Sequence, residues 1–168
     1  MLLWAIVIVV LAAVVWQDFK NRAVYVWIFP LLAGLAVIQS VMLGVFSLAA
    51  TAANLAIIVL QLCLLNLLMY TRTKKWLMHG EQWIGWGDIA FFAVLACCFS
   101  TVNFVIFHVL SLLIILVGAL VAMAFGRFSV HIPLAGGQAA LLGLLLLADY
   151  GQWGRRLYID LDMLGFVQ

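Results

Sequence analysis

Charged side chains are scarce in this chain. Only 8% of its 168 residues are Asp, Glu, Lys or Arg, whereas 69% are hydrophobic and the mean hydropathy is +1.29. An ordinary soluble domain has about 25% charged and about 45–50% apolar residues. The shortage of charge therefore excludes a soluble catalytic domain and predicts one membrane-embedded domain, residues 1–168. Any chemistry must then come from residues within or just outside the lipid bilayer.

Disulfide and metal-binding patterns are also missing. The three cysteines are odd in number, lie in apolar runs and lack C-x-x-C spacing: Cys63, Cys97 and Cys98. They are predicted to be small packing residues rather than a disulfide framework or a zinc site. The chain has no H-E-x-x-H motif and no serine in a G-x-S-G setting, which excludes the common zinc and serine intramembrane proteases. We expect no metal, no cofactor and no nucleic-acid partner.

Long apolar runs are abundant instead, and they predict an all-α polytopic membrane protein with six transmembrane helices. A spanning helix needs about 20 apolar residues, with a range of about 17–25. Breaks at charged or Gly-, Asn- and Ser-containing stretches leave segments near 2–17, 24–44, 47–70, 83–101, 103–125 and 132–149. The first lacks a basic n-region and a small-residue cleavage site, so it is predicted to be a retained span rather than a secretory signal.

Basic residues are distributed unevenly between alternate connections. Six of the eight lie in the connections at 18–23, 71–82 and 126–131: Lys20, Arg22, Arg72, Lys74, Lys75 and Arg127. The other two, Arg155 and Arg156, lie in the C-terminal tail. By the positive-inside rule, the three connections are expected on the cytoplasmic side of the inner (plasma) membrane and both termini outside.

Two aspartates stand at the cytoplasmic ends of predicted spans. Asp18 closes the first span, and Asp88 lies about five residues into the fourth. A carboxyl near hydrocarbon is costly and usually marks a functional site. Two carboxyls held close together share a proton, so one can activate water while the other donates a hydrogen bond to a scissile carbonyl. This is the chemistry of an aspartyl protease.

Glycines flank the second aspartate in the stretch GWGDIAF (85–91). Without a Cβ, Gly85 and Gly87 let the backbone stay extended and let a substrate strand approach closely. The alternative interpretation is that Asp88 caps the fourth helix and Asp18 is an interfacial helix-end residue. Charge placement alone leaves both interpretations open.

The stretches DFKNRAVYV (18–26), GWGDIAF (85–91) and HIPLAGG (131–137) resemble the type IV prepilin peptidases, a family of GxGD intramembrane aspartyl proteases. The resemblance covers essentially the whole chain and implies that Asp18 and Asp88 are the catalytic pair. It also implies that Gly85, Trp86 and Gly87 contact substrate and that Pro133 marks the break before the last span. The implied reaction removes a short basic leader from type IV prepilins or pseudopilins, whose apolar helix stays in the bilayer.

The chain departs from the family pattern at several positions. Tyr25 and Val26 stand where Pro-Asn is usual, Trp86 replaces a glycine, Ala90 replaces a lysine, and Gly136 stands at a second proline. The cysteine-bearing cytoplasmic region of the larger bifunctional members has no counterpart. We therefore expect a minimal, peptidase-only form that does not methylate the trimmed pilin.

Two other classes of protein stay open. A small proton-coupled transporter or channel would use Asp18 and Asp88 as a relay. Polar residues in the membrane centre are too few to trace a path for it: Gln61, Asn66 and His108. A noncatalytic assembly subunit of a pilus or secretion system fits if the aspartates are dispensable. His108 is predicted to be a packed or hydrogen-bonded histidine rather than a catalytic one.

Overall fold

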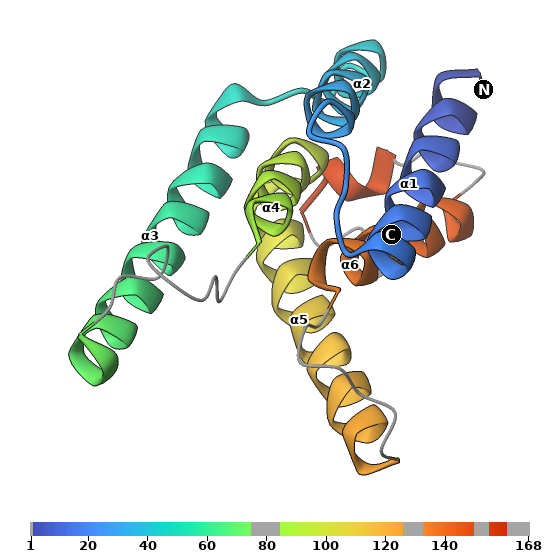
Figure 1. Ribbon diagram of the computed structural model, residues 1–168. Coiled ribbons are helices and arrows are strands. Elements are labelled where there is room, and N and C mark those ends of the chain that lie inside the picture. The colour runs from blue at the N-terminus through green and yellow to red at the C-terminus, as the bar shows by residue number, and fades with distance from the viewer. Residues whose placement is uncertain (1, 75–84, 126–132, 150–154, 161–168) are drawn as a thin grey trace.

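The computed structural model describes residues 2–74, 85–125, 133–149 and 155–160. Within these ranges the chain forms six α-helices and one short 3₁₀ helix, and it contains no strand. The elements are α1 (Leu2–Asn21), α2 (Ile28–Met42), α3 (Leu48–Thr73), α4 (Trp86–Cys98), α5 (Thr101–Ala124), α6 (Leu134–Ala148) and η2 (Arg155–Tyr158) (Figure 1). The all-helical prediction is confirmed for the described residues, and the helices follow the order of the six apolar segments.

The helices fall into two length classes. Three are long and apolar enough to cross a membrane: α1 with 20 residues, Leu48–Arg72 of α3 with 25, and α5 with 24. The other three, α2, α4 and α6, have 15, 13 and 15 residues. At 1.5 Å per residue they are roughly 20–22 Å long, which is shorter than a hydrocarbon core of about 30 Å. Full spanning length is therefore reached by three of the six predicted spans in the described part of the chain.

Local backbone geometry explains why the predicted segments shorten. Gly44 has φ +68°, a left-handed conformation that ends α2 near Met42. Arg22 (φ 52°) ends α1, and its N–H donates to the Asp18 carbonyl at 3.0 Å. At the start of α3, the Ser47 hydroxyl accepts the N–H of Ala50 at 3.2 Å, the usual N-cap arrangement. Turn and cap residues thus occupy the ends of the apolar runs.

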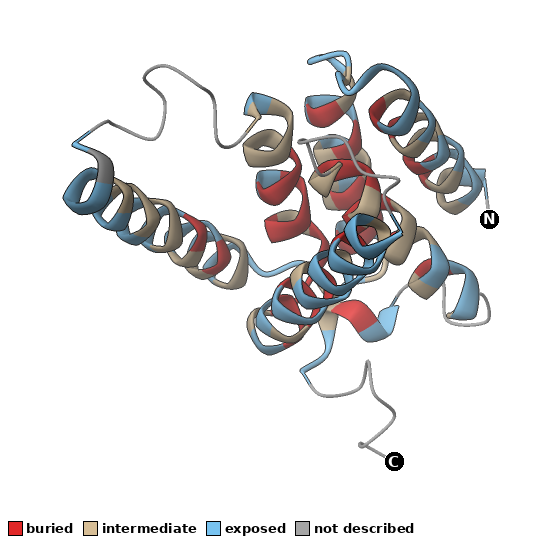
Figure 2. Cartoon of the chain, turned by 60° about the horizontal axis from the view of Figure 1, so that its bottom comes forward, coloured by how far each residue is buried: buried red, intermediate tan, exposed pale blue. Residues whose placement is uncertain are grey.

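The core lies among α1, α2, α4 and α6: α1 packs on α6 and α2, and α4 packs on α2 and α6. Its most deeply buried large side chains include Phe91 and Leu95 of α4, Leu11 of α1 and Leu142 of α6. Figure 2 shows burial concentrated on these central helices, whereas α3 is mostly exposed. α3 packs on α4 and α5 and presents a row of exposed leucines on its remaining surface. Apolar side chains exposed in this way suit contact with lipid tails.

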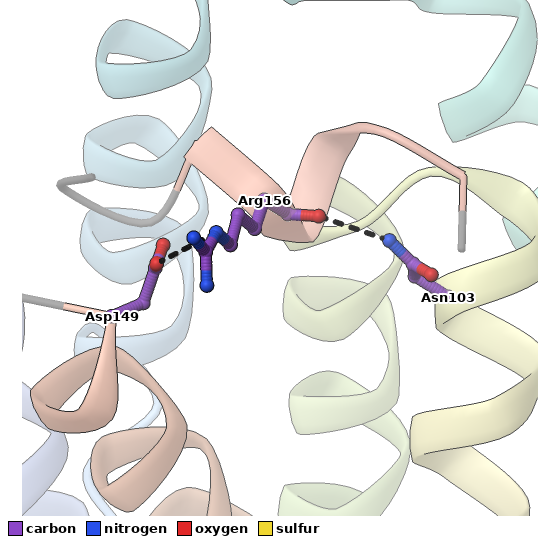
Figure 3. Close-up of polar contacts among 3 residues, drawn as sticks. All are labelled: Asn103, Asp149 and Arg156. Atoms are coloured by element: carbon purple, nitrogen blue, oxygen red, sulfur yellow. Dashed lines mark hydrogen bonds and ion pairs between the residues drawn. The ribbon is translucent and has the colours of Figure 1, made fainter. Parts of the chain in front are cut away.

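One end of the bundle is closed by η2, which follows α6. The side-chain amide of Asn103, which is fully buried, lies 3.1, 3.1 and 2.6 Å from the carbonyl oxygens of Arg156, Leu157 and Ile159. Figure 3 shows Arg156 between Asn103 and Asp149, with its Nε 3.7 Å from the Asp149 carboxylate. We call this the η2 end.

Further contacts fix the η2 end to the start of α5. The N–H of Ser100 donates to the Leu157 carbonyl at 3.0 Å, and the N–H of Val102 donates to the Asp160 carboxylate at 3.2 Å. The Tyr158 hydroxyl donates to the Ala36 carbonyl of α2 at 3.3 Å. Because Leu157 is buried, η2 packs into this end of the bundle.

Candidate aspartyl pair

Asp18 lies in the last turn of α1 and is only 8% exposed. A carboxylate at a helix C-terminus faces the negative end of the helix dipole, so its position needs compensation. That compensation comes from α6, because the Asp18 Oδ2 accepts the backbone N–H of Gly136 at 2.5 Å. The free amides in the first turn of a helix are natural partners for a carboxylate.

Asp88 is the third residue of α4, closer to the helix start than the five residues predicted. Its Oδ2 accepts the N–H of Gly85 at 3.2 Å, and its Oδ1 accepts the N–H of Ala135 at 2.8 Å. The first contact caps the N-terminus of α4, which agrees with the alternative interpretation of Asp88 as a helix-capping residue. The second contact joins α4 to α6. One carboxyl therefore both caps its own helix and reaches a distant one.

The structure brings the two predicted catalytic carboxyls to the same turn of α6. Asp88 and Asp18 bind the amides of consecutive residues, Ala135 and Gly136. Consecutive backbone nitrogens are about 3 Å apart, so the two bonded oxygens are at most about 9 Å apart. Charges at this separation that are partly shielded from water still interact. Three segments far apart in the sequence thus meet at one site, which we call the aspartate end.

Gly136 is the residue that allows the close approach of α1 to α6. A Cβ built on it would lie 2.8 Å from Asp18 Oδ2, 2.9 Å from Asp18 Cβ and 3.1 Å from Phe19 Cδ2. Any other residue would push Asp18 away from the amide that it binds. The sequence analysis noted Gly136 only as a departure from the family pattern. The Gly-Gly pair at 136–137 could have indicated a close helix–helix contact there.

The other predicted site residues surround Asp88 and the start of α6. Pro133 is the N-cap residue of α6, so the predicted break before the last helix is confirmed. Gly85 has an extended backbone (φ −71°, ψ 143°), and Trp86 is 62% exposed. Gly87 lies inside the first turn of α4. The expectation of an extended backbone is therefore right for Gly85 and wrong for Gly87, because α4 begins at Trp86.

The aspartate end lies well short of the end of α5. A Cβ on Gly137 of α6 would meet the Ile115 side chain at 2.8 Å, which places these two residues side by side. From Ile115, α5 continues to Ala124, a distance of about 14 Å. Within α4, Asp88 lies about 15 Å along the helix axis from the last residue, Cys98. The carboxyls therefore lie partway along α5 rather than level with its C-terminal end.

Polar residues next to the pair were missed from the sequence. Gln138 lies one turn beyond Ala135 and contacts Ser111 and His108, and His108 contacts Gln61. The prediction that His108 is hydrogen-bonded is confirmed. The prediction counted only Gln61, Asn66 and His108 and found them too few to trace a path across the membrane, and the structure places two of them, Gln61 and His108, in one cluster. The prediction overlooked Ser111 and Gln138, whose apolar surroundings in the sequence gave no signal.

No set of three His, Cys, Asp or Glu side chains that could hold a metal ion occurs in the described ranges. Much of the predicted cytoplasmic connections, 75–82 and 126–131, lies outside these ranges.

Comparison with known proteins adds no assignment: no family model, curated protein or solved structure matches the chain. The functional assignment must therefore rest on the aspartyl pair and its surroundings.

Proposed function

We propose that the chain is an intramembrane aspartyl endopeptidase that removes the short basic leader from type IV prepilins or pseudopilins. The observation that carries the proposal is the convergence of Asp18 and Asp88 on the consecutive amides of Ala135 and Gly136. The motif resemblance supports the same assignment, because its three stretches supply Asp18, Asp88 and the start of α6.

The proposed reaction uses the two carboxyls as one acid–base unit. One aspartate, as carboxylate, takes a proton from water, and the hydroxide attacks the carbonyl carbon of the scissile peptide. The other aspartate, protonated, donates its proton to the carbonyl oxygen. As the C–N bond breaks, the first aspartate gives its proton to the leaving nitrogen, and one hydroxyl of the tetrahedral intermediate returns a proton to the second aspartate. The products are an amine and a carboxylic acid, and the pair is back in its starting state. The α6 amides hold both side chains in place throughout.

The surroundings of Asp88 favour a peptide substrate that is anchored in the membrane. Asp88 is only partly buried, and the neighbouring Trp86 is exposed. Gly85 has no Cβ beside the carboxyl, so a peptide can approach Asp88 closely there, while the N–H and carbonyl of Gly85 are bonded within the start of α4. An apolar pilin helix would lie in lipid against the bundle while its N-terminal segment reaches the carboxyls.

We further propose that all six helices insert in the inner (plasma) membrane, with both termini outside and the aspartate end on the cytoplasmic side. The six-to-two partition of basic residues supports this orientation. Since α5 extends about 14 Å past the level of Gly137, one residue after the Gly136 amide that Asp18 binds, the carboxyls would lie below the membrane surface. The short α4 and α6 would then begin within the bilayer, where the site amides are paired with carboxylates.

A proton relay is the second candidate function. The hydrogen-bonded chain Gln61–His108–Gln138 favours it, because a transport path needs connected polar groups. The closed η2 end argues against it, because Leu157 is buried there and Tyr158 bonds to α2. A noncatalytic assembly subunit is the third possibility and predicts that both aspartates are dispensable.

The test is cleavage of a candidate prepilin in cells that co-express the chain. Wild type should shorten the prepilin by its leader, and Asp88→Asn should abolish the product. Asp160→Asn is the matched control, because Asp160 accepts the Val102 amide at the η2 end and asparagine can accept it too. Undiminished cleavage by Asp88→Asn would refute the peptidase assignment. Loss of cleavage in both variants would point to a fold defect instead.

A further inference from the structure

Four polar side chains form a hydrogen-bonded cluster between α3, α5 and α6. His108 Nε2 lies 2.9 Å from Gln61 Oε1, and His108 Nδ1 lies 3.4 Å from Gln138 Nε2. Gln138 Nε2 also donates to Ser111 Oγ at 2.9 Å. His108, Ser111 and Gln138 are buried. The cluster therefore links α6 to α5 directly and to α3 through His108.

The contacts of the cluster define a single consistent arrangement of protons. Gln61 Oε1 can only accept, so the His108 proton is on Nε2 and Nδ1 is an acceptor. Nδ1 then accepts from the Gln138 amide. The Ser111 hydroxyl donates to the His108 carbonyl at 3.0 Å, which leaves its oxygen free to accept from Gln138. Both hydrogens of the Gln138 amide are thereby committed to α5.

The histidine ring is also held by aromatic contacts. Phe92 of α4 meets it edge-on, with ring centroids 4.9 Å apart, and Phe104 of α5 stacks on it at 5.4 Å. A side chain with partners on α3, α4 and α6 has little rotational freedom. His108 is therefore a fixed point against which α6 is oriented.

Gln138 lies three residues after Ala135 and two after Gly136 in the same helix. Residues three apart share a helix face, so fixing Gln138 against α5 fixes the rotation of the first turn of α6. That rotation decides where the amides of Ala135 and Gly136 point. Because the two aspartates bind these consecutive amides, a small rotation of α6 would disturb both carboxyls at once.

We infer that His108 and Gln138 are positioning residues for the aspartyl pair, acting through the first turn of α6. The inference rests on the proposed function in that the pair is taken to be catalytic. Single polar contacts between membrane helices are weak on average. Their loss should leave the protein folded. A misplacement of about 1 Å in a catalytic group can nevertheless reduce the rate about 10²-fold.

The experiment compares Gln138→Leu and His108→Phe with a matched control, Asn54→Leu. Asn54, like Gln138, is a fully buried carboxamide whose carbonyl oxygen has no hydrogen-bond partner among the described residues. Its amide bonds to the carbonyls of Ala96 and Phe99, near the η2 end. Hydrogen exchange is measured at the Ala135 and Gly136 amides in protein labelled with ¹⁵N-alanine and ¹⁵N-glycine. kcat and KM are measured for prepilin cleavage on the same samples.

We expect both cluster variants to exchange the two amides at least about tenfold faster and to lower kcat about 10- to 100-fold at nearly constant KM. Asn54→Leu should change neither quantity. Unchanged exchange in both cluster variants, equal acceleration by Asn54→Leu, or an unchanged kcat would each overturn the inference. If Gln138→Leu fails to fold, Ser111→Ala, which removes one acceptor of Gln138, takes its place under the same criteria. If wild type cleaves no prepilin, the proposed function fails and amide exchange alone decides the positioning role.

Discussion

Each end of this bundle is fixed by side chain-to-backbone hydrogen bonds, but the two ends use different chemical groups for them. At the η2 end, the neutral amide of Asn103 donates to backbone carbonyls more than 50 residues away. At the aspartate end, two carboxyls accept backbone N–H groups from the start of α6. Both arrangements tie distant segments together by side chain-to-backbone hydrogen bonds. The carboxylate that accepts an amide at the η2 end, that of Asp160, is exposed, whereas Asp18 is buried and Asp88 is partly buried.

The difference indicates what each end is for. A buried neutral amide satisfies backbone groups without the desolvation cost of a charge. The same would be possible at the aspartate end, because the carbonyl oxygen of asparagine can accept an N–H as a carboxylate does. Carboxyls there carry a cost that helix capping does not require. The difference supports the proposal that the aspartate end performs proton chemistry, whereas the η2 end serves to hold the fold together.

The sharpest way to break this comparison is to make the aspartate end neutral. Asp18→Asn and Asp88→Asn should each reduce prepilin cleavage by at least about 10³-fold, because each carboxyl needs the other for its protonation. Groups that act as a unit lose activity non-additively, so the double variant should be no worse than either single one. Asp88→Glu should also be severely impaired, because the longer side chain misplaces the carboxyl. Multiplicative losses in a single-turnover assay would mean that the two residues act independently.

The next largest effect is expected from a single methyl group. Gly136→Ala places a Cβ 2.8 Å from Asp18 Oδ2 and should displace that carboxyl, lowering kcat about 10²-fold. Gly143→Ala is the matched control in the same helix, because a Cβ there meets no atom within 4 Å. It should raise the free energy of unfolding by roughly 0.5–1 kcal/mol and leave cleavage unchanged. Equal cleavage by the two variants would show that the close approach at Gly136 is unimportant.

The η2 end should respond in stability rather than in activity. Asn103→Leu removes a donor to three carbonyls and should lower the free energy of unfolding by about 2–4 kcal/mol. The cleavage rate of the folded fraction should stay within about twofold of wild type. Denaturant unfolding in detergent micelles and a cleavage assay at low temperature measure the two quantities. A selective loss of cleavage at full stability would make this end part of the active site.

The smallest effect is expected for the ion pair in Figure 3. The Arg156 side chain is 49% exposed and its Nε lies 3.7 Å from the Asp149 carboxylate. The Asp149 side chain is only 10% exposed, but the 3.7 Å separation is long and Arg156 stays in contact with solvent, so the pair should contribute no more than a surface pair, between zero and about 1 kcal/mol. Arg156→Gln should therefore change stability by about 0.5 kcal/mol or less and leave cleavage unaffected. A loss as large as that of Asn103→Leu would mean that the charge, and not the neutral amide, holds η2.

Much of the helix order and the aspartyl pair could be predicted from the sequence, because both follow from long apolar runs broken by rare charges. The helix lengths could not, because turn residues such as Gly44 end a helix inside an apolar run. Asn103 and Gln138 also escaped prediction. Their partners lie 53 and 27 residues away, and a polar residue in an apolar run does not reveal a distant partner. Gly136 lies in one of the family-like stretches, but its contact with Asp18 depends on how α1 packs on α6, which the sequence does not reveal.

The most direct test of the account measures stability and cleavage on one purified sample of Asp18→Asn in lipid nanodiscs. Asparagine can still accept the Gly136 amide, so the free energy of unfolding should stay within about 1 kcal/mol of wild type. Cleavage of a synthetic prepilin should fall at least about 10³-fold, because the pair can no longer exchange a proton. Cleavage at the wild-type rate by a stably folded Asp18→Asn protein would contradict the central claim that the aspartate end performs proton chemistry.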